Sequence, residues 1–276
     1  MKTFLTRTLT SIVYAAVVVA GLLVHPFLFA VVFLALAVLA LLEYQRMVKM
    51  SGAEPQIWTG VLLTAVFFIS LFGFVTGFLP SSLVFAMIPL FLLVFVVELY
   101  RKKEHPMANI AFTLSGFLYI GFPMGLSNLL AFPLSEGKHV FYPWIFLGIV
   151  ITLWLYDSGA YLVGTPFGKH RLFERISPKK SWEGVLGGSV LAMLAGVLNA
   201  WFFQTIELHT WLIISAIVIV AGTYGDLAES LMKRSLGIKD SGSVLPGHGG
   251  FLDRLDSLLF TVPMVVALLY LVRIAL

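Results

Sequence analysis

Four aspartates stand out because they lie within, or at the ends of, long apolar segments. Asp157 lies in LWLYDSGAYLVG, Asp226 in GTYGDLAESLMKR, and Asp253 and Asp256 in FLDRLD. Ionisable side chains inside a membrane are costly, and they usually mark function. Several carboxylates that meet with few bases between them form the hard oxygen site that Mg²⁺ prefers. The four aspartates are therefore candidate magnesium ligands.

Simpler explanations exist for some of these acids. Glu229 and Lys233 have the i, i+4 spacing of an ordinary helical ion pair. Asp253 and Asp256 would also favour the positive N-terminus of the last helix. Neither explanation accounts for Asp157, Asp226, Asp253 and Asp256 all falling near one face of the membrane.

A basic segment, SPKKSWEGVLGG at 177–188, precedes one of the apolar runs. We expect Ser177 or Pro178 to start a helix, with Lys179 and Lys180 at its positive end. Backbone N–H groups and two ammonium groups suit a phosphate. Most basic loops are simply solvated, so phosphate binding and a plain surface loop both remain open on this pattern alone.

The glycine-rich segment PGHGG at 246–250 allows a tight turn whose backbone can approach an anion closely. His248 is either a loop histidine or a donor to a phosphate. Other chemistry is excluded more firmly. The chain has no cysteine, so disulfides and cysteine-bound zinc are absent. It has no Walker sequence, no dinucleotide fingerprint after a strand and no G-x-S-x-G elbow.

The elements that must position these residues are membrane helices. The 276 residues are 59% hydrophobic and 12% charged, against about 45–50% and about 25% in soluble domains. A span needs roughly 20 apolar residues, and apolar runs of this kind recur along the whole chain. Lys2 and Arg7 precede the first run as in a signal peptide, but we interpret it as an uncleaved helix. The predicted fold is an all-α polytopic membrane protein with about nine spans, near 8–24, 27–42, 57–79, 81–99, 107–132, 140–163, 184–204, 210–232 and 255–276.

The basic residues orient these spans. With a cytoplasmic N-terminus, 16 of the 18 lysines and arginines fall on the cytoplasmic side, and only Lys138 and Arg273 fall on the other. The C-terminus is therefore expected on the opposite side. We predict an N-terminal region at 1–135 with about five spans and a C-terminal catalytic region at 136–276. The catalytic region carries cytoplasmic loops at 164–183 and 233–254.

Residues 230–256, SLMKRSLGIKDSGSVLPGHGGFLDRLD, resemble the signature of phosphatidate cytidylyltransferases, also called CDP-diacylglycerol synthases. The matching positions are Ser230, Lys233, Arg234, Lys239, Asp240, Gly242, Leu245, Pro246, His248, Gly249, Gly250, Asp253, Arg254 and Asp256. YDSGAY at 156–161 and SPKKSWEG at 177–184 also resemble stretches of that family. The first five spans match it only in being hydrophobic.

This resemblance implies a nucleotidyltransferase of phospholipid biosynthesis that makes CDP-diacylglycerol and pyrophosphate from phosphatidic acid and CTP. It implies Mg²⁺ as cofactor, with a second cation left open, and a multi-pass protein of the cytoplasmic membrane whose active site faces the cytoplasm. No nucleic-acid partner is expected, and a homodimer is left open. The implied catalytic residues are Asp226, Asp253, Asp256 and Lys233. The implied metal ligands are Asp157, Asp226, Asp253 and Asp256. The implied phosphate contacts are Lys179, Lys180, Arg234, Lys239, His248, Gly249, Gly250 and Arg254.

Three other functions compete with this one. A transporter or channel would show inverted repeats and acids near the midplane, neither of which is present. A CDP-alcohol phosphotransferase would carry D-G-x2-A-R-x8-G-x3-D-x3-D, which is absent. A membrane lipid or polyprenol kinase would share the nucleotide and the basic loops, so it stays open until CTP and ATP are compared.

Overall fold

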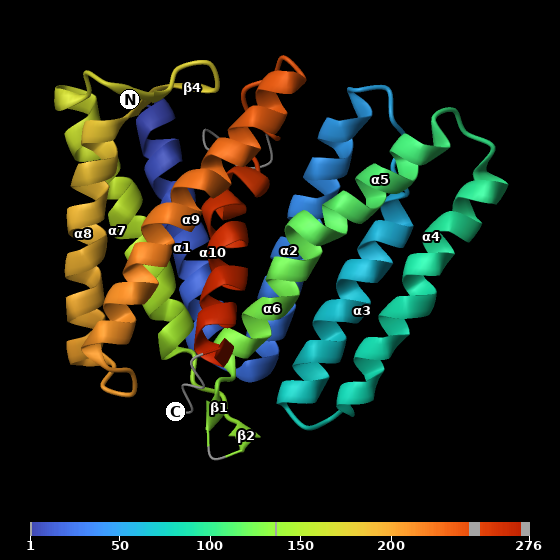
Figure 1. Ribbon diagram of the computed structural model, residues 1–276, viewed down its shortest axis with the longest axis horizontal. Helices are drawn as coiled ribbons and strands as arrows, with labels where there is room; N and C mark the ends of the chain where they lie inside the picture. Colours follow the sequence, from blue (N-terminus) through green and yellow to red (C-terminus); the bar gives the residue numbers. More distant parts are fainter. Residues whose placement is uncertain (1, 136, 243–248, 272–276) are drawn as a thin grey trace.

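The computed structural model describes residues 2–135, 137–242 and 249–271 as a bundle of long helices (Figure 1). In this part of the chain, eight helices are long and apolar enough to cross a membrane, and Leu9–Leu23 forms a shorter apolar helix. The prediction of an all-α polytopic membrane protein with about nine spans is confirmed. The helices are α1 (Lys2–Leu23), α2 (Pro26–Lys49), α3 (Ile57–Val75), η1 (Ser81–Ala86), α4 (Met87–Arg101), α5 (Pro106–Gly116), η2 (Phe117–Gly121), α6 (Phe122–Ala131), α7 (Trp144–Phe167), α8 (Trp182–Phe202), α9 (Leu208–Ser235) and α10 (Leu252–Leu271).

Several short segments combine into single spans or join them. η1 and α4 form one span, Ser81–Arg101, and α5, η2 and α6 form another, Pro106–Ala131. Two antiparallel hairpins lie at opposite ends of the bundle: β1 (Leu134–Ser135) with β2 (Lys138–His139), and β3 (Arg171–Phe173) with β4 (Ser177–Ser181) (Figure 1). We call the two ends of the molecule the β1–β2 end and the β3–β4 end.

The predicted helix start at Ser177 or Pro178 is wrong. Residues 177–181 form strand β4, whose backbone pairs with β3 in the register Arg171 with Ser181 and Phe173 with Ser177. Helix α8 starts at Trp182, because the hydroxyl of Ser181 accepts a hydrogen bond from the N–H of Gly184 at 3.2 Å. Lys179 and Lys180 therefore project from a strand and not from a helix N-terminus.

The helices around the predicted catalytic region are packed closely. A Cβ atom on Gly188 of α8 would lie 2.7 Å from the carbonyl oxygen of Tyr156 in α7, so only glycine permits this approach. Small residues allow membrane helices to approach in this way, and van der Waals contact then drives their association. The loops that follow are shorter than predicted, since α7 continues to Phe167, α9 to Ser235, and α10 begins at Leu252.

One apolar core joins the two predicted regions of the chain. It contains Phe29 and Phe33 of α2 together with Phe146 of α7, Trp211 of α9 and Leu259 of α10, all buried. A smaller core lies among α3, α4 and η2. The helices on either side of residue 135 thus stabilise each other.

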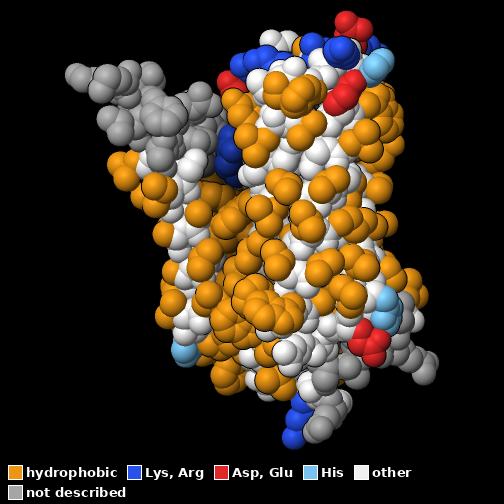
Figure 2. Space-filling view, turned by 90° about the vertical axis from the view of Figure 1, so that its left-hand side faces the viewer, with side chains coloured by type: hydrophobic (Ala, Val, Ile, Leu, Met, Phe, Trp, Pro, Cys, Tyr) orange, Lys and Arg blue, Asp and Glu red, His pale blue; other side chains and the backbone are white. Residues whose placement is uncertain are grey.

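The outer surface has the pattern of a membrane protein. A broad band of hydrophobic side chains lies between two ends that carry the charged atoms (Figure 2). Arg101 ends α4 and Lys49 ends α2 at the β3–β4 end, whereas Lys138 lies in β2 at the other end (Figure 1). Arg273 lies outside the described residues. That the β3–β4 end faces the cytoplasm stays a prediction.

Candidate active site

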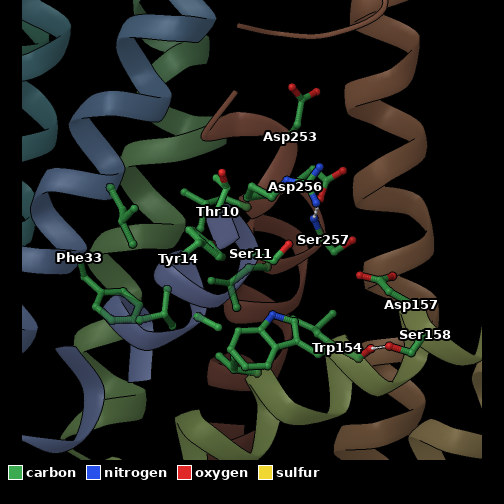
Figure 3. A pocket seen from close by; sticks show the side chains of 18 residues that line it. Thr10, Ser11, Tyr14, Phe33, Trp154, Asp157, Ser158, Asp253, Asp256 and Ser257 are labelled. Atoms are coloured by element: carbon green, nitrogen blue, oxygen red, sulfur yellow. Dashed lines mark hydrogen bonds between the residues drawn. The ribbon is translucent and has the colours of Figure 1, made fainter. Parts of the chain in front are cut away.

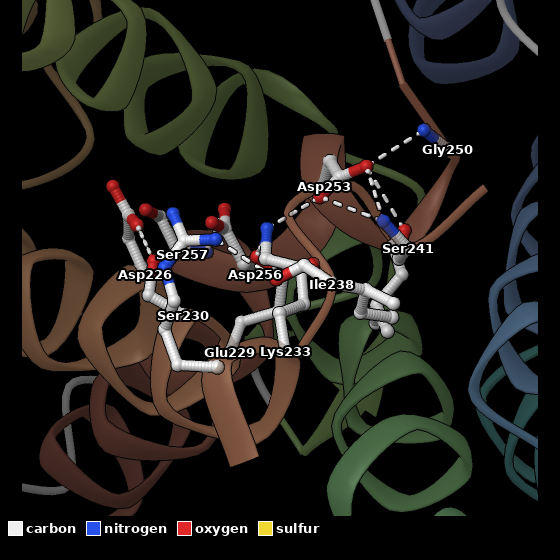
Figure 4. A network of polar contacts seen from close by, with 12 residues as sticks. Asp226, Glu229, Ser230, Lys233, Ile238, Ser241, Gly250, Asp253, Asp256 and Ser257 are labelled. Carbon is white, nitrogen blue, oxygen red and sulfur yellow. Dashed lines mark hydrogen bonds and ion pairs between the residues drawn. The ribbon is translucent and has the colours of Figure 1, made fainter. Parts of the chain in front are cut away.

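Three carboxylates from three helices lie in one region near the β3–β4 end. Helices α9 and α10 touch at Gly225, where a Cβ atom would lie 2.5 Å from the carbonyl oxygen of Asp256. This contact brings Asp226 near Asp256, and α7 adds Asp157; each of the three carboxylates acts electrostatically on the other two. Figures 3 and 4 show Asp256 from two sides, with Asp157 and Asp226 respectively. Like charges repel, so these three carboxylates together favour a bound cation.

The β3–β4 hairpin supplies one cation directly. Lys180 Nζ lies 2.5 Å from Asp226 Oδ2, and both side chains are about one-third exposed, at 28% and 33%. Ser230 donates a hydrogen bond to the other oxygen of Asp226 at 3.2 Å. Lys179, the preceding residue in the strand, is exposed. The sequence-predicted pair of lysines is thus split between one that contacts the site and one that faces outward.

Asp253 lies in a different network from Asp256, although the two are three residues apart. Its carboxylate accepts hydrogen bonds from Lys233 Nζ at 2.5 Å and from the N–H groups of Ser241 at 3.1 Å and Gly250 at 2.7 Å (Figure 4). The Ser241 hydroxyl donates as well, at 3.0 Å. Lys233 also forms an ion pair with Glu229, which confirms the helical pair expected from the sequence.

Glu43 is a residue of this region that the sequence did not single out. It lies in α2 and is buried, with 3% exposure. Its Oε2 accepts a hydrogen bond from the N–H of Leu252 at 3.0 Å, and the Ser241 hydroxyl lies at 3.5 Å. In the sequence, Glu43 follows directly after a predicted span and precedes Arg46, so it resembled an interfacial residue. Its one signal was a carboxylate at the end of an apolar run.

The other predicted phosphate contacts are distributed unevenly. Arg234 donates to the carbonyl of Ile238 at 2.8 Å and approaches that of Ile176 at 3.4 Å, so it ties α9 to the hairpin segment. Lys239 is exposed. Gly249 has φ +80°, a left-handed conformation that favours glycine. His248 lies outside the described residues.

A cavity of about 440 Å³ opens beside the carboxylates, between α1, α2, α7 and α10 (Figure 3). Asp157, Arg254 and Asp256 line its polar part, while Phe33, Leu36 and other apolar side chains line the rest. The charge of Arg254 acts on Asp157. The cavity therefore offers both an ionic and an apolar surface within one space.

The carboxylate oxygens of this site are the kind of ligand that Mg²⁺ prefers, but they are not arranged as a complete metal site in this structure. Among the described residues, no three Asp, Glu or His side chains are grouped so that they could hold a metal ion together. Mg²⁺ is, however, usually bound through one or two carboxylates, with substrate phosphates and water completing its shell. The mutual repulsion of Asp157, Asp226 and Asp256 fits a cation of that kind, bound together with a phosphate ligand.

Comparison with known proteins gives consistent results. Residues 5–272 match the model of the cytidylyltransferase family. The chain is 34% identical over 271 residues to the phosphatidate cytidylyltransferase of Bacillus subtilis, which covers 96% of each chain. It is 32% identical over 287 residues to that of Synechocystis, which covers 94% of each. The match to the Staphylococcus haemolyticus protein of the same name is 38% identical over 170 residues and spans 61% of this chain and 62% of that protein.

Proposed function

Because the chain belongs to the cytidylyltransferase family, we propose that it transfers the cytidylyl group of CTP to phosphatidic acid. The products are CDP-diacylglycerol and pyrophosphate. The observation that carries this proposal is the cavity beside the three carboxylates. Its walls are ionic on one side and apolar on the other, which suits a substrate with a phosphate head group and acyl chains.

The reaction joins two anions. A phosphate oxygen of phosphatidic acid attacks the α-phosphorus of CTP, and the bond from that phosphorus to the oxygen bridging the α- and β-phosphates breaks. Pyrophosphate leaves with that bonding pair. The attacking oxygen is already anionic near neutral pH, so a strong general base is not needed. The requirement is to hold two anions together in line, which calls for fixed positive charge and positioning.

We assign this positive charge to lysine and arginine side chains of the chain itself. Lys180 lies at the carboxylate cluster, and Arg254 lines the cavity. The exposed side chains of Lys179 and Lys239 belong to segments next to the site and are proposed to attract the triphosphate. Gly249 and Gly250 are proposed to present backbone to a phosphate, together with His248. Lys233 is held by Glu229 and Asp253, so we propose that it acts by fixing those carboxylates.

Mg²⁺ is proposed to be held by one or two of Asp157, Asp226 and Asp256 together with a substrate phosphate, where it would supply positive charge against the triphosphate. Asp253 stays a predicted ligand, and four protein donors contact its carboxylate in this conformation. The apolar part of the cavity, between α1, α2 and α7, is proposed to receive the glycerol and the first methylenes of the acyl chains. A site bounded by membrane helices would let the lipid reach the nucleotide without leaving the bilayer.

The test uses purified protein in mixed micelles with phosphatidic acid, Mg²⁺ and CTP labelled at the α-phosphate. We expect labelled lipid to appear with an equal amount of pyrophosphate. A parallel reaction with ATP labelled at the γ-phosphate and with diacylglycerol or polyprenol distinguishes a lipid kinase. Label from ATP in lipid, or no lipid product from CTP, would overturn the proposal.

A further inference from the structure

We propose that Glu43 of α2 is a positioning residue for the catalytic loop, defined here as the described residues between α9 and α10, 236–242 and 249–251. Its carboxylate fixes the start of α10, and with it the directions of Asp253 and Asp256. The N-terminal spans would then act on the catalytic loop through this buried side chain, in addition to lining the cavity. The inference rests on the proposed function only for the identity of the reaction being supported.

The contacts of Glu43 join distant parts of the chain. Oε2 accepts from the N–H of Leu252, the first residue of α10, across 209 positions of sequence at 3.0 Å. The Ser241 hydroxyl, 198 positions away, lies 3.5 Å from the same oxygen. A carboxylate at a helix N-terminus bonds an N–H group that has no partner within the helix, and it lies at the positive end of the helix dipole.

The hydrogen bond from the Leu252 N–H is the main interaction that offsets the cost of burying the Glu43 carboxylate. The side chain is 3% exposed, and among the described residues it forms no ion pair within 4.0 Å. Its Oε1 has no hydrogen-bond partner in that part of the chain. A buried carboxylate is stable only where donors face it. The carboxylate therefore strongly favours the arrangement that brings the Leu252 N–H to it.

Two glycines of the loop, Gly242 and Gly250, lie directly against the Glu43 carboxylate. A Cβ atom on Gly250 would collide with Glu43 Oε2 and would lie 2.5 Å from the Ser241 hydroxyl, and one on Gly242 would lie 2.8 Å from Oε1. Two backbone segments thus lie against one carboxylate. This gives a physical reason, independent of phosphate binding, for the absence of a side chain at Gly250.

Glu43 is also linked to the functional carboxylate network. Ser241 contacts Glu43 with its hydroxyl and donates to Asp253 through both its N–H and its hydroxyl. Asp253 in turn binds Lys233 (Figure 4). A change at Glu43 therefore reaches Lys233 through two intermediates, Ser241 and Asp253.

The first experiment compares Glu43→Ala and Glu43→Gln with a matched control, Glu98→Ala. Glu98 of α4 is likewise a buried glutamate, and it accepts hydrogen bonds from Gln56, Arg101 and Asn109 away from the loop. We measure hydrogen exchange of peptides containing Ser241 and Leu252 in protein without substrate or metal. Glu43→Ala should speed exchange of the Leu252 amide by roughly 10- to 100-fold, the equivalent of one lost charge-assisted hydrogen bond. Glu98→Ala should leave it unchanged.

The kinetic readout separates positioning from general stability. Glu43→Ala should lower kcat by about 10-fold or more with little change in KM for phosphatidic acid, because the apolar side chains of α1, α2 and α7 that line the cavity are unchanged. Glu43→Gln keeps an acceptor oxygen, so it should recover most of kcat. Glu98→Ala should lower the melting temperature without lowering kcat of the folded protein. A kcat loss no greater than that of Glu98→Ala, or unchanged exchange at Leu252, overturns the proposal.

A double-mutant cycle with Gly250→Ala tests the steric part and does not depend on Glu43→Ala alone. Gly250→Ala should lower kcat strongly in the protein that keeps Glu43. The same substitution should lower kcat much less in the Glu43→Ala background, so that the two effects on kcat are coupled by roughly 10-fold or more. Additive effects would refute the inference. If the chain proves to have no CTP-dependent activity, the exchange measurements still decide whether Glu43 holds the loop.

Discussion

At the residue scale, the site contains two groups of acids. In the first group Asp226 is paired with the partly exposed Lys180, and the second group shares one buried lysine. Asp157, Asp226 and Asp256 interact as like charges, whereas Asp253 and Glu229 share Lys233. Removing one member of the first group should affect cation binding, and removing one of the second should release a buried ammonium group. Substitutions in the two groups should therefore have different effects on the protein.

We expect Asp256→Asn to lower kcat by about 100-fold or more, since it removes a charge proposed to hold the cation. Binding of Mn²⁺, followed by electron paramagnetic resonance in the absence of substrate, should weaken in the same variant. Normal Mn²⁺ affinity in both Asp256→Asn and Asp226→Asn would contradict the proposed ligands.

Asp253→Asn should also abolish turnover while leaving expression and folding intact, as expected if Asp253 is a ligand or holds Lys233. Exchange at Ser241 and Gly250 tells the two roles apart, because Asp253 accepts from both N–H groups. Faster exchange with unchanged Mn²⁺ affinity would assign Asp253 to the loop. Near-normal activity would refute both roles.

At the element scale, the contact between α7 and α8 sets where Asp157 and Lys180 lie. α7 carries Asp157, and the β3–β4 hairpin that joins the two helices carries Lys180. The close approach at Gly188 leaves no room for a side chain. The geometry of the hairpin therefore depends on the packing of the two helices that it joins.

Gly188→Leu should lower the free energy of unfolding by roughly 1–3 kcal/mol, because the new side chain meets the backbone of Tyr156. Thermal unfolding in detergent measures the effect. Val190→Leu is the control, since Val190 is 61% exposed on α8 and should leave the midpoint unchanged. Equal midpoints for the two variants would show that the helices separate without cost.

At the scale of the whole molecule, the charge distribution predicts orientation. The native chain has no cysteine, so single cysteines report one position each. Lys102→Cys follows α4 at the β3–β4 end, and Lys138→Cys lies in β2 at the other end. We expect a membrane-impermeant maleimide to label Lys138→Cys in intact cells and Lys102→Cys only after the membrane is opened. The reverse pattern would place the active site outside.

The sequence by itself determined the helices and the chemistry of their ends. Nine apolar runs predict nine spans, because a bilayer satisfies no backbone hydrogen bonds and therefore forces each run into a helix. The types and spacing of the residues at 230–256 indicated phosphate and cation chemistry. These properties depend only on which residues follow one another within a short stretch of the chain.

Only the tertiary structure decided which side chains meet. An apolar span shows where a helix lies in the bilayer, but its nearly uniform hydrophobicity does not fix which face meets which neighbour. The sequence therefore missed Glu43, whose partner Leu252 lies 209 positions away. It also grouped Asp253 with Asp256, which bind different partners. The helix expected at 177–181 became a strand because pairing with β3, a contact between separate segments, satisfied its backbone. Helix rotation and strand pairing are properties of packed neighbours, so they appear only when the chain is folded.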